Sequence, residues 1–220
     1  MALFFVLAFP LLLIAMARLR LPGGEPTLIL GVALSVSVAM GSFAGLAINL
    51  ASAIEKGILT RVYVTPMSLA VHLGARLLAP SAVIFLALLA ILFTVHTFYG
   101  LPVGSAQLAR LILAMALGMV AFGALGLGLG SLAKRANTAS FLTQLVLFPL
   151  VLAEAVALGK LGGGKAVGWL ELLLFVSPLH ALANLSSAQS ATGAIFSVVS
   201  LMFWTAIGLL YGAKRIRSVL

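Results

Sequence analysis

Long apolar runs alternate along the chain with short polar stretches. Because a membrane-spanning helix needs about 20 mostly apolar residues, this pattern predicts a bundle of spans. Five runs are long enough to cross a bilayer, at residues 27–54, 77–99, 106–132, 138–158 and 191–211.

A sixth apolar run occupies residues 2–17 and is shorter than the others. At 1.5 Å per residue it reaches only about 24 Å. We interpret it as a short first span. The alternative is a signal peptide, because Ala15-Met16-Ala17 resembles a cleavage site, although the first residues carry no basic side chain.

Prolines and glycines mark special positions within the predicted spans. Pro80 lies near the start of the third span, where its missing amide donor is tolerated. Pro149 lies inside the fifth span, where we expect a kink. Small residues let neighbouring helices approach closely, and the packing positions expected on this basis are Gly41, Gly45, Gly126 and Gly130.

The region between the fifth run and the last one is ambiguous. Residues 169–185 are apolar enough to suggest a seventh span, but they include Glu171 and His180. Ionisable side chains at membrane depth cost several kcal/mol. We therefore expect a re-entrant or interfacial segment that is buried against protein on the outer side.

The basic residues orient the bundle. If the chain crosses six times with its N-terminus inside, eight of the 13 Lys and Arg residues lie on the inner side. A seventh span would reverse that bias, against the tendency of basic residues to stay cytoplasmic. We therefore predict six spans in the cell (inner or plasma) membrane, with both termini in the cytoplasm. The inner set is Lys56, Arg61, Arg76, Lys134, Arg135, Lys214, Arg215 and Arg217.

The composition identifies the class of protein. Hydrophobic residues make up 63% of the chain and charged residues only 8%, whereas a water-soluble domain has roughly 25% charged residues. We therefore predict an all-α integral membrane protein with a single transmembrane domain over residues 1–220. The net charge of +9 is explained by basic residues at span ends, where they meet anionic lipid, so no nucleic-acid partner is expected.

The residues needed for most catalysis are missing or scattered. The sequence has no Cys and no Asp, which excludes disulfides, thiolate nucleophiles and Asp-based metal sites. Residues 159–166 come within one residue of a nucleotide-binding P-loop, but Ala166 replaces the hydroxyl that binds Mg²⁺. His72, His96 and His180 lack metal-ligand spacing and are interpreted as interface or hydrogen-bonded packing residues. We expect no enzyme activity in this chain and no directly bound cofactor or metal.

Glu154 is the most informative polar residue within a span. A carboxylate in a membrane helix is costly and suggests a function. Glu154 also lies near the outer end of the fifth span, where it could reach the lipid headgroups. Both a substrate-pathway role and interfacial anchoring stay open. Gln144, Asn49 and Asn137 are expected to face the bundle interior, where hydrogen bonding between helices is the simpler explanation. The first two also join Glu154 as candidate pathway residues.

A charged stretch at residues 53–66 separates the second and third apolar runs. About twenty residues lie between the two spans, more than the two to eight that a helix connection needs. Apolar residues recur in this stretch at helical spacing, which predicts a short amphipathic helix along the membrane face, ended by Thr65-Pro66. Those apolar residues are Ile58, Leu59, Val62 and Tyr63.

The same stretch resembles a motif of type-2 ABC transporter permeases. Residues 55–66 read E-K-G-x-L-T-R-x-x-V-T-P, close to the family pattern E-x-G-T-L-E-x-L-x-x-T-P after the second span. Ile58 replaces the usual Thr, and Thr60 replaces the usual acid. A second resemblance lies in Phe148-Pro149-Leu150, followed by Ser177-Pro178-Leu179 before the last span.

The resemblance implies the permease half of an ABC exporter. Such a permease dimerises in the lipid bilayer, as a homodimer or a heterodimer, and pairs with a separate ATP-binding subunit that holds ATP and Mg. The cytoplasmic helix after the second span docks on that subunit and receives its motion. The residues implied in this coupling are Glu55, Lys56, Gly57, Leu59, Arg61, Tyr63, Thr65 and Pro66.

Two other functions fit the same layout of spans. A haem-exporter-type permease of cytochrome c maturation has a similar length and span count. A membrane scaffold or assembly subunit would have the spans without transport. Substrate-stimulated ATP hydrolysis would separate a permease from a scaffold.

Overall fold

The computed structural model describes residues 2–20, 26–58, 69–100, 103–160, 174, 176–187 and 191–217, and its regular structure there is entirely helical. This agrees with the predicted all-α class. In chain order the helices are α1 (Ala2–Arg20), α2 (Pro26–Val38), η1 (Ala39–Ala44), α3 (Gly45–Glu55), α5 (Leu69–Tyr99), α6 (Ser105–Ala133), α7 (Ala136–Lys160), α9 (Pro178–Ser187) and α10 (Ala191–Arg217).

The helix at the centre of the bundle runs unbroken over Pro26–Glu55, through α2, η1 and α3. Every residue of α2 from Ile29 to Val38 is buried. Its α2 part packs against α1, α5 and α9, and its α3 part against α6 and α7. A helix that is apolar all round is expected to be buried on all sides. The predicted second span is thus the core of the fold.

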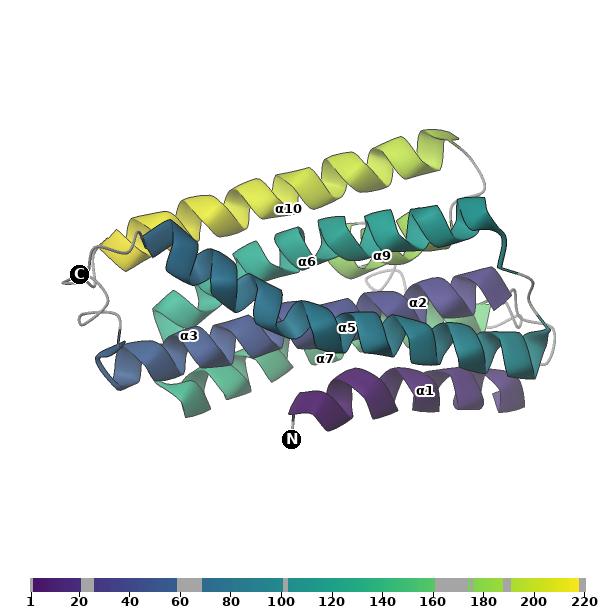
Figure 1. The fold of residues 1–220 in the computed structure, drawn as a ribbon, viewed down its shortest axis with the longest axis horizontal. Helices are drawn as coiled ribbons and strands as arrows, with labels where there is room; N and C mark the ends of the chain where they lie inside the picture. Colours follow the sequence, from purple (N-terminus) through teal and green to yellow (C-terminus); the bar gives the residue numbers. More distant parts are fainter. Residues whose placement is uncertain are drawn as a thin grey trace.

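The other long helices surround this core and run along the same long axis (Figure 1). α10 lies beside α6 and also packs against α9. Figure 1 places the end of α3 and the end of α10 at the same end of the bundle. α1 runs along only part of the length of the bundle (Figure 1). The interior is therefore held mainly by contacts to the Pro26–Glu55 helix and to α6.

Five helices are long and apolar enough to cross a membrane, among the residues that the structure describes. They correspond to the five long apolar runs of the sequence. The apolar part of α1, Val6–Leu19, is shorter than a span usually is. α9 has ten residues and reaches about 15 Å, half of the roughly 30 Å of a bilayer core.

The predicted third span, residues 77–99, agrees with the apolar segment Pro80–Tyr99 that is long enough to cross a membrane. The helix that contains it, α5, begins about two turns before residue 77, at Leu69, so Pro80 lies inside the helix and not near the helix start. Leu and Ala residues in this stretch are strong helix formers. A proline inside a helix removes one hydrogen bond and bends the helix, and α5 changes direction along its course (Figure 1).

Glycines bring α6 against the central helix. A Cβ added at Gly126 would lie 2.7 Å from the carbonyl oxygen of Phe43, and one at Gly130 would lie 2.6 Å from that of Ala47. Gly41 is equally tight, since its Cβ would lie 2.8 Å from the Ile84 side chain of α5. Gly45 differs from these three, because its nearest neighbour would be 3.9 Å away.

Polar contacts tie α1 to α5 at the end of the bundle opposite the end of α3. The Tyr99 hydroxyl donates to the carbonyl oxygen of Ile14 at 3.3 Å. The Arg18 guanidinium donates to the Phe98 carbonyl and lies over the Tyr99 ring, 5.2 Å from its centroid. Ile14 and Ala17 are buried in the main core. The short first helix is therefore an integral part of the packed bundle.

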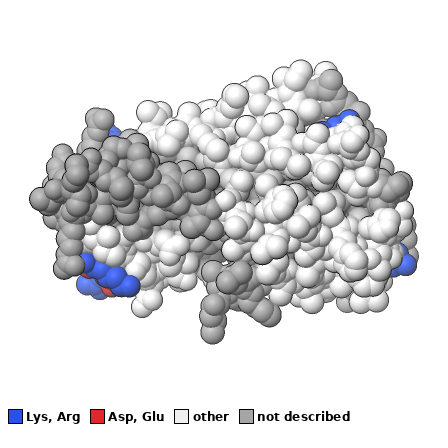
Figure 2. Space-filling model, viewed as in Figure 1, with Lys and Arg blue, Asp and Glu red and all other residues white. Residues whose placement is uncertain are grey.

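Charged side chains lie toward the two ends of the long axis on the face shown in Figure 2, with uncharged surface between them. Large apolar side chains are exposed between the ends, including Phe93 at 73% and Phe148 at 72%. Such a band of exposed apolar side chains suits contact with lipid and not with water.

Candidate functional site

The end of α3 meets the start of α7 through a side chain. The Glu55 carboxylate accepts a hydrogen bond from the backbone N–H of Ala136 at 3.0 Å. Ala136 is the first residue of α7, and the first N–H groups of a helix have no partner within it. Glu55 therefore caps a helix that begins 81 residues later in the chain.

The turn between α6 and α7 is tight and basic. Lys134 ends α6 in the left-handed conformation, with φ of 56°, and the Arg135 carbonyl accepts the hydrogen bond from Ala139 N–H. Together with Glu55, these residues border a polar hollow of about 550 Å³, which Asn137 and Thr138 also line. The hollow lies at the end of the bundle where the predicted coupling stretch begins.

Only the start of the predicted coupling stretch lies among the described residues. The Lys56 and Gly57 N–H groups close the last turn of α3 by bonding to Ser52 and Ile54, and Gly57 has φ of +64°. Ile58 packs against the cluster of Leu46, Leu50, Ala53 and Leu127. The other predicted coupling residues, Leu59, Arg61, Tyr63, Thr65 and Pro66, lie outside the described residues, as does the amphipathic helix.

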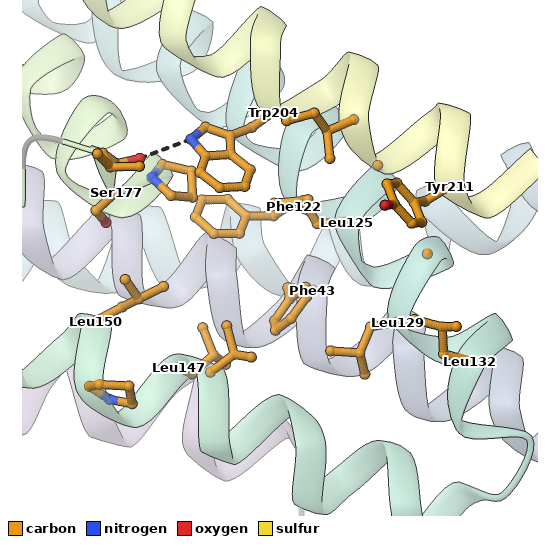
Figure 3. Close-up of a pocket in the computed structure, with 17 residues that line it drawn as sticks. Phe43, Phe122, Leu125, Leu129, Leu132, Leu147, Leu150, Ser177, Trp204 and Tyr211 are labelled. Atoms are coloured by element: carbon orange, nitrogen blue, oxygen red, sulfur yellow. Dashed lines mark hydrogen bonds between the residues drawn. The ribbon is translucent and has the colours of Figure 1, made fainter. Parts of the chain in front are cut away.

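A cavity of about 500 Å³ lies between α6, α7 and α10 (Figure 3). Phe122 contributes from α6, Leu147 and Leu150 from α7, and Trp204 and Tyr211 from α10. Ligand sites in proteins occupy about 300–1,000 Å³ and are mostly apolar with a few polar groups. This cavity therefore has the size and character to hold an apolar group of a ligand or a lipid chain.

A hydrogen bond from α10 closes one side of the cavity. The indole N–H of Trp204 donates to the carbonyl oxygen of Val176 at 2.9 Å, the dashed line in Figure 3. Val176 and Ser177 lie just before α9 and also line the cavity. The bond therefore fixes the chain before α9 against α10.

Replacing Trp204 with phenylalanine should lower the free energy of unfolding by about 1 kcal/mol or less, the usual net worth of one hydrogen bond. Thermal unfolding in detergent micelles measures the change. The neighbouring Phe203 is 60% exposed, so Phe203→Leu serves as the control and should stay within about 0.5 kcal/mol of the wild type. An equal loss in both variants would contradict a specific role for the indole N–H.

The buried carboxylate of Glu154 pairs with His180. The His180 Nδ1 atom lies 3.1 Å from one carboxylate oxygen and 3.3 Å from the other. The Glu154 side chain is 1% exposed and the His180 side chain 32%. Glu154 therefore does not reach out to the headgroups, and the interfacial-anchor interpretation is wrong. α7 packs against α9, which carries His180.

Local structure positions His180 for this pairing. The Ser177 hydroxyl accepts hydrogen bonds from the N–H groups of Leu179 at 3.1 Å and His180 at 3.3 Å. Ser177 is thus the N-cap of α9, with Pro178 at the first helical position, an arrangement that favours a helix start. His180 belongs to this first turn.

The Glu154–His180 pair lies beside one end of the cavity. Glu154 is one helical turn beyond Leu150 on the same face of α7, and His180 is two residues after Pro178. Leu150 and Pro178 both line the cavity. A buried, polar pair next to an apolar cavity is the kind of arrangement that fixes the orientation of an amphiphilic ligand.

The other predicted polar residues lie elsewhere. Gln144, Asn49 and Asn137 are exposed in this chain, so the expectation that they face the bundle interior is wrong. Small and apolar residues fill that interior instead, such as Ala51, Ala133 and Ala139 where α3, α6 and α7 meet. The three candidate pathway residues Glu154, Gln144 and Asn49 are therefore not brought together within one chain.

Two features of the candidate site were not predicted from the sequence: the start of α9 at Ser177 and the pairing of His180 with Glu154. Ser177-Pro178 before an apolar helix carries the signal of a helix start and could have placed His180 in a first turn. The pairing of His180 with Glu154 has no comparable signal, because the two residues are 26 positions apart. Among the described residues, no group of three His, Cys, Asp or Glu side chains could hold a metal ion.

Comparison with protein families decides the class of this protein. The sequence model of the ABC-2 type transporter family matches residues 1–155. The chain belongs to the ABC-2 type transporter family. No curated protein and no solved structure matches the chain. The resemblance to type-2 ABC transporter permeases is thereby confirmed.

As a member of the ABC-2 family, the chain is a membrane transport component. It is a multi-pass permease of an ABC transporter. The matched part contains α1 to α6 and most of α7, including Glu55 and Glu154. α9 and α10, which supply His180 and Trp204, lie beyond it.

Proposed function

We propose that this ABC-2 permease is one half of an ATP-driven exporter, coupled through residues 55–66 to a separate ABC ATP-binding subunit that holds ATP and Mg. One observation carries the proposal. The motif of residues 55–66 begins at the end of the Pro26–Glu55 helix, which forms the core of the bundle. A force applied to the end of that buried helix acts on every helix packed against it. A packed core responds to such a force by repacking as a unit.

In this proposal the chain crosses the membrane six times, with α1 as the sixth span. Val6–Leu19 covers about 21 Å, and local thinning of the bilayer accommodates a short span at modest cost. α9 enters from the outer side without crossing, buried among α2, α6 and α10. The end of α3 faces the cytoplasm, because Lys56, Lys134 and Lys214 lie at the helix ends on that side.

Substrate passes between this permease and a second permease half, identical or different. Gln144 and Asn49 fit that interface, because both side chains are exposed in the single chain. Asn49 lies six residues before the end of α3 and Gln144 eight residues after the start of α7, about 9 and 12 Å from the cytoplasmic helix ends. Both suit the entrance of an export pathway. Glu154 lies farther along α7, where it would meet a substrate after α9 has moved.

Removing residues 59–66 should abolish association with the ATP-binding subunit while the permease still inserts into the membrane. The subunit is expected to be encoded in a neighbouring reading frame. Co-purification of the two chains from detergent-solubilised membranes measures association. A second variant replaces the eight residues by a Gly-Ser linker of equal length. It preserves the connection between α3 and α5 but removes the apolar side chains, so it should lose association as well. An ATPase that co-purifies unchanged with both variants would overturn the coupling role.

Transport itself requires a second measurement. ATP hydrolysis by the complex in liposomes should rise when transported substrate is added. A complex whose hydrolysis never responds to any amphiphile tested, and in which none crosses the bilayer, would favour the scaffold function. Stimulation by haem alone would favour a haem exporter.

A further inference from the structure

We infer that Glu55 acts inside the permease, as the positioning residue that transmits the motion of the coupling stretch to α7, and not as a contact to the ATP-binding subunit. The inference rests on the proposed function and deepens it. The resemblance grouped Glu55 with the docking residues, whereas its carboxylate is bonded to the first residue of another helix.

The start of α7 depends on Glu55 for its cap. The residue at the N-cap position is Arg135, whose carbonyl oxygen accepts the first hydrogen bond of the helix from Ala139. An arginine side chain has no acceptor and cannot cap the free N–H groups of the first turn, unlike the Ser, Thr, Asp and Asn that usually do so. Glu55 supplies that acceptor from α3, and its negative charge also complements the positive end of the helix dipole.

The covalent position of Glu55 makes it a link. It is the last residue of α3, and the turn at Lys56 and Gly57 leads directly into the predicted docking stretch. A displacement of that stretch therefore moves Glu55 before it moves any other residue of the central helix. The connection to α7 is equally direct, because the backbone N–H of Ala136 makes the hydrogen bond and not a flexible side chain.

Small residues make the contact between α3 and α7 able to slide. Ala51 of α3 and Ala139 of α7 are buried together with Ala133 at the end of α6, with Ile48 and Leu142 at the border of this cluster. Methyl groups offer little interlocking surface compared with large side chains, so the junction holds the two helices close without fixing their register. The polar bond of Glu55 is what fixes the register at this end.

α7 carries the motion to the cavity. Leu147, Pro149 and Leu150 line the cavity on this helix, and Leu147 lies 11 residues after Ala136, about 17 Å along the axis. At the far end of α7, Glu154 is bonded to His180 of α9. A shift of α7 at Ala136 therefore changes the cavity wall and pulls on α9, so one carboxylate bond connects the docking stretch to both.

The test measures helix movement in the complex of permease and ATPase in lipid nanodiscs. The natural chain has no Cys, so Leu145→Cys on α7 and Leu209→Cys on α10, both exposed positions, give two unique spin-label sites. Labelled chains are diluted into unlabelled ones, and the α7–α10 distance distribution is recorded without nucleotide and after trapping with ATP and vanadate. The wild type should show a new distance on trapping.

Glu55→Ala should keep the ATPase bound and hydrolysing, while the fraction of chains that reach the new distance falls roughly fivefold, the effect of losing a typical cap. Glu55→Gln should restore most of the response, because its amide oxygen can still accept from Ala136. The matched control is Phe141→Leu, at a 66% exposed position on α7, which should behave as the wild type.

Three results would overturn the inference. A full distance change in Glu55→Ala would show that the bond transmits nothing. Loss of the ATPase in Glu55→Ala and in Glu55→Gln would make Glu55 a docking residue. A wild-type preparation that binds no ATPase would overturn the proposed function as well. This outcome is distinguishable from the other two because it is observed in the unsubstituted permease.

Discussion

Replacing His180 with alanine should lower the free energy of unfolding of this permease by about 3 kcal/mol, the lower end of the range for breaking a buried ion pair. The loss comes from Glu154, whose 1% exposed carboxylate would keep its place in the bundle without its partner. The lower end of the range applies because 32% of the His180 side chain is exposed. Thermal or denaturant unfolding in detergent micelles measures the change.

Two variants show whether the unpaired carboxylate is the cause. The double variant E154L/H180L removes both polar groups and should recover much of the stability, as apolar replacements of buried pairs often do. Leu152→Ala is the control for truncating a side chain at a 47% exposed position of the same helix as Glu154, α7, and should change stability by about 0.5 kcal/mol or less. If the double variant is no more stable than His180→Ala, the lost packing of the imidazole accounts for the effect.

Replacing Gly208 with alanine should destabilise the bundle by about 3 kcal/mol, since overpacking costs typically 1–3 kcal/mol and more when backbone must move. The new Cβ would lie 2.5 Å from the carbonyl carbon of Ala124 and 2.5 Å from the nitrogen of Leu125. Both are backbone atoms of α6, so α6 and α10 must separate. Alanine has a higher helix propensity than glycine by roughly 0.5–1 kcal/mol, which is too little to compensate.

Other glycines of the chain provide a graded control. Gly212 lies one turn later on α10, and its added Cβ would be 3.4 Å from the nearest atom, the nitrogen of Gly128. Gly104 has no atom within 4 Å of an added Cβ. Thermal midpoints should therefore fall in the order Gly208→Ala, Gly212→Ala, Gly104→Ala, from the largest loss to the smallest. Equal losses at Gly208 and Gly104 would contradict the close packing of α6 and α10.

Helix existence was predictable because it depends on local composition. A run of apolar residues must form a helix in lipid, since backbone groups have no other partners there. Five runs of the sequence became long helices for this reason. Boundaries were less predictable, as the start of α5 at Leu69 shows, because a proline at position 80 bends a membrane helix without ending it.

In the candidate site, some residues were predictable from the sequence and their partners were not. The motif that begins at Glu55 was visible in the sequence, because its residues are contiguous, and so was the unusual carboxylate of Glu154. Their partners were not visible. Ala136 donates to Glu55 through its backbone, and a backbone N–H leaves no trace in the sequence. His180 was visible only as one of three scattered histidines.

The sequence by itself determined the class of this protein. A chain with 63% hydrophobic and 8% charged residues belongs in a membrane, and one contiguous motif was enough to indicate an ABC permease. Only the tertiary structure decided what the polar residues do. A carboxylate in lipid must find a partner, and which partner it finds depends on which helices lie side by side. That arrangement set Glu55 on the start of α7 and Glu154 on the first turn of α9, and turned Gln144 and Asn49 outward.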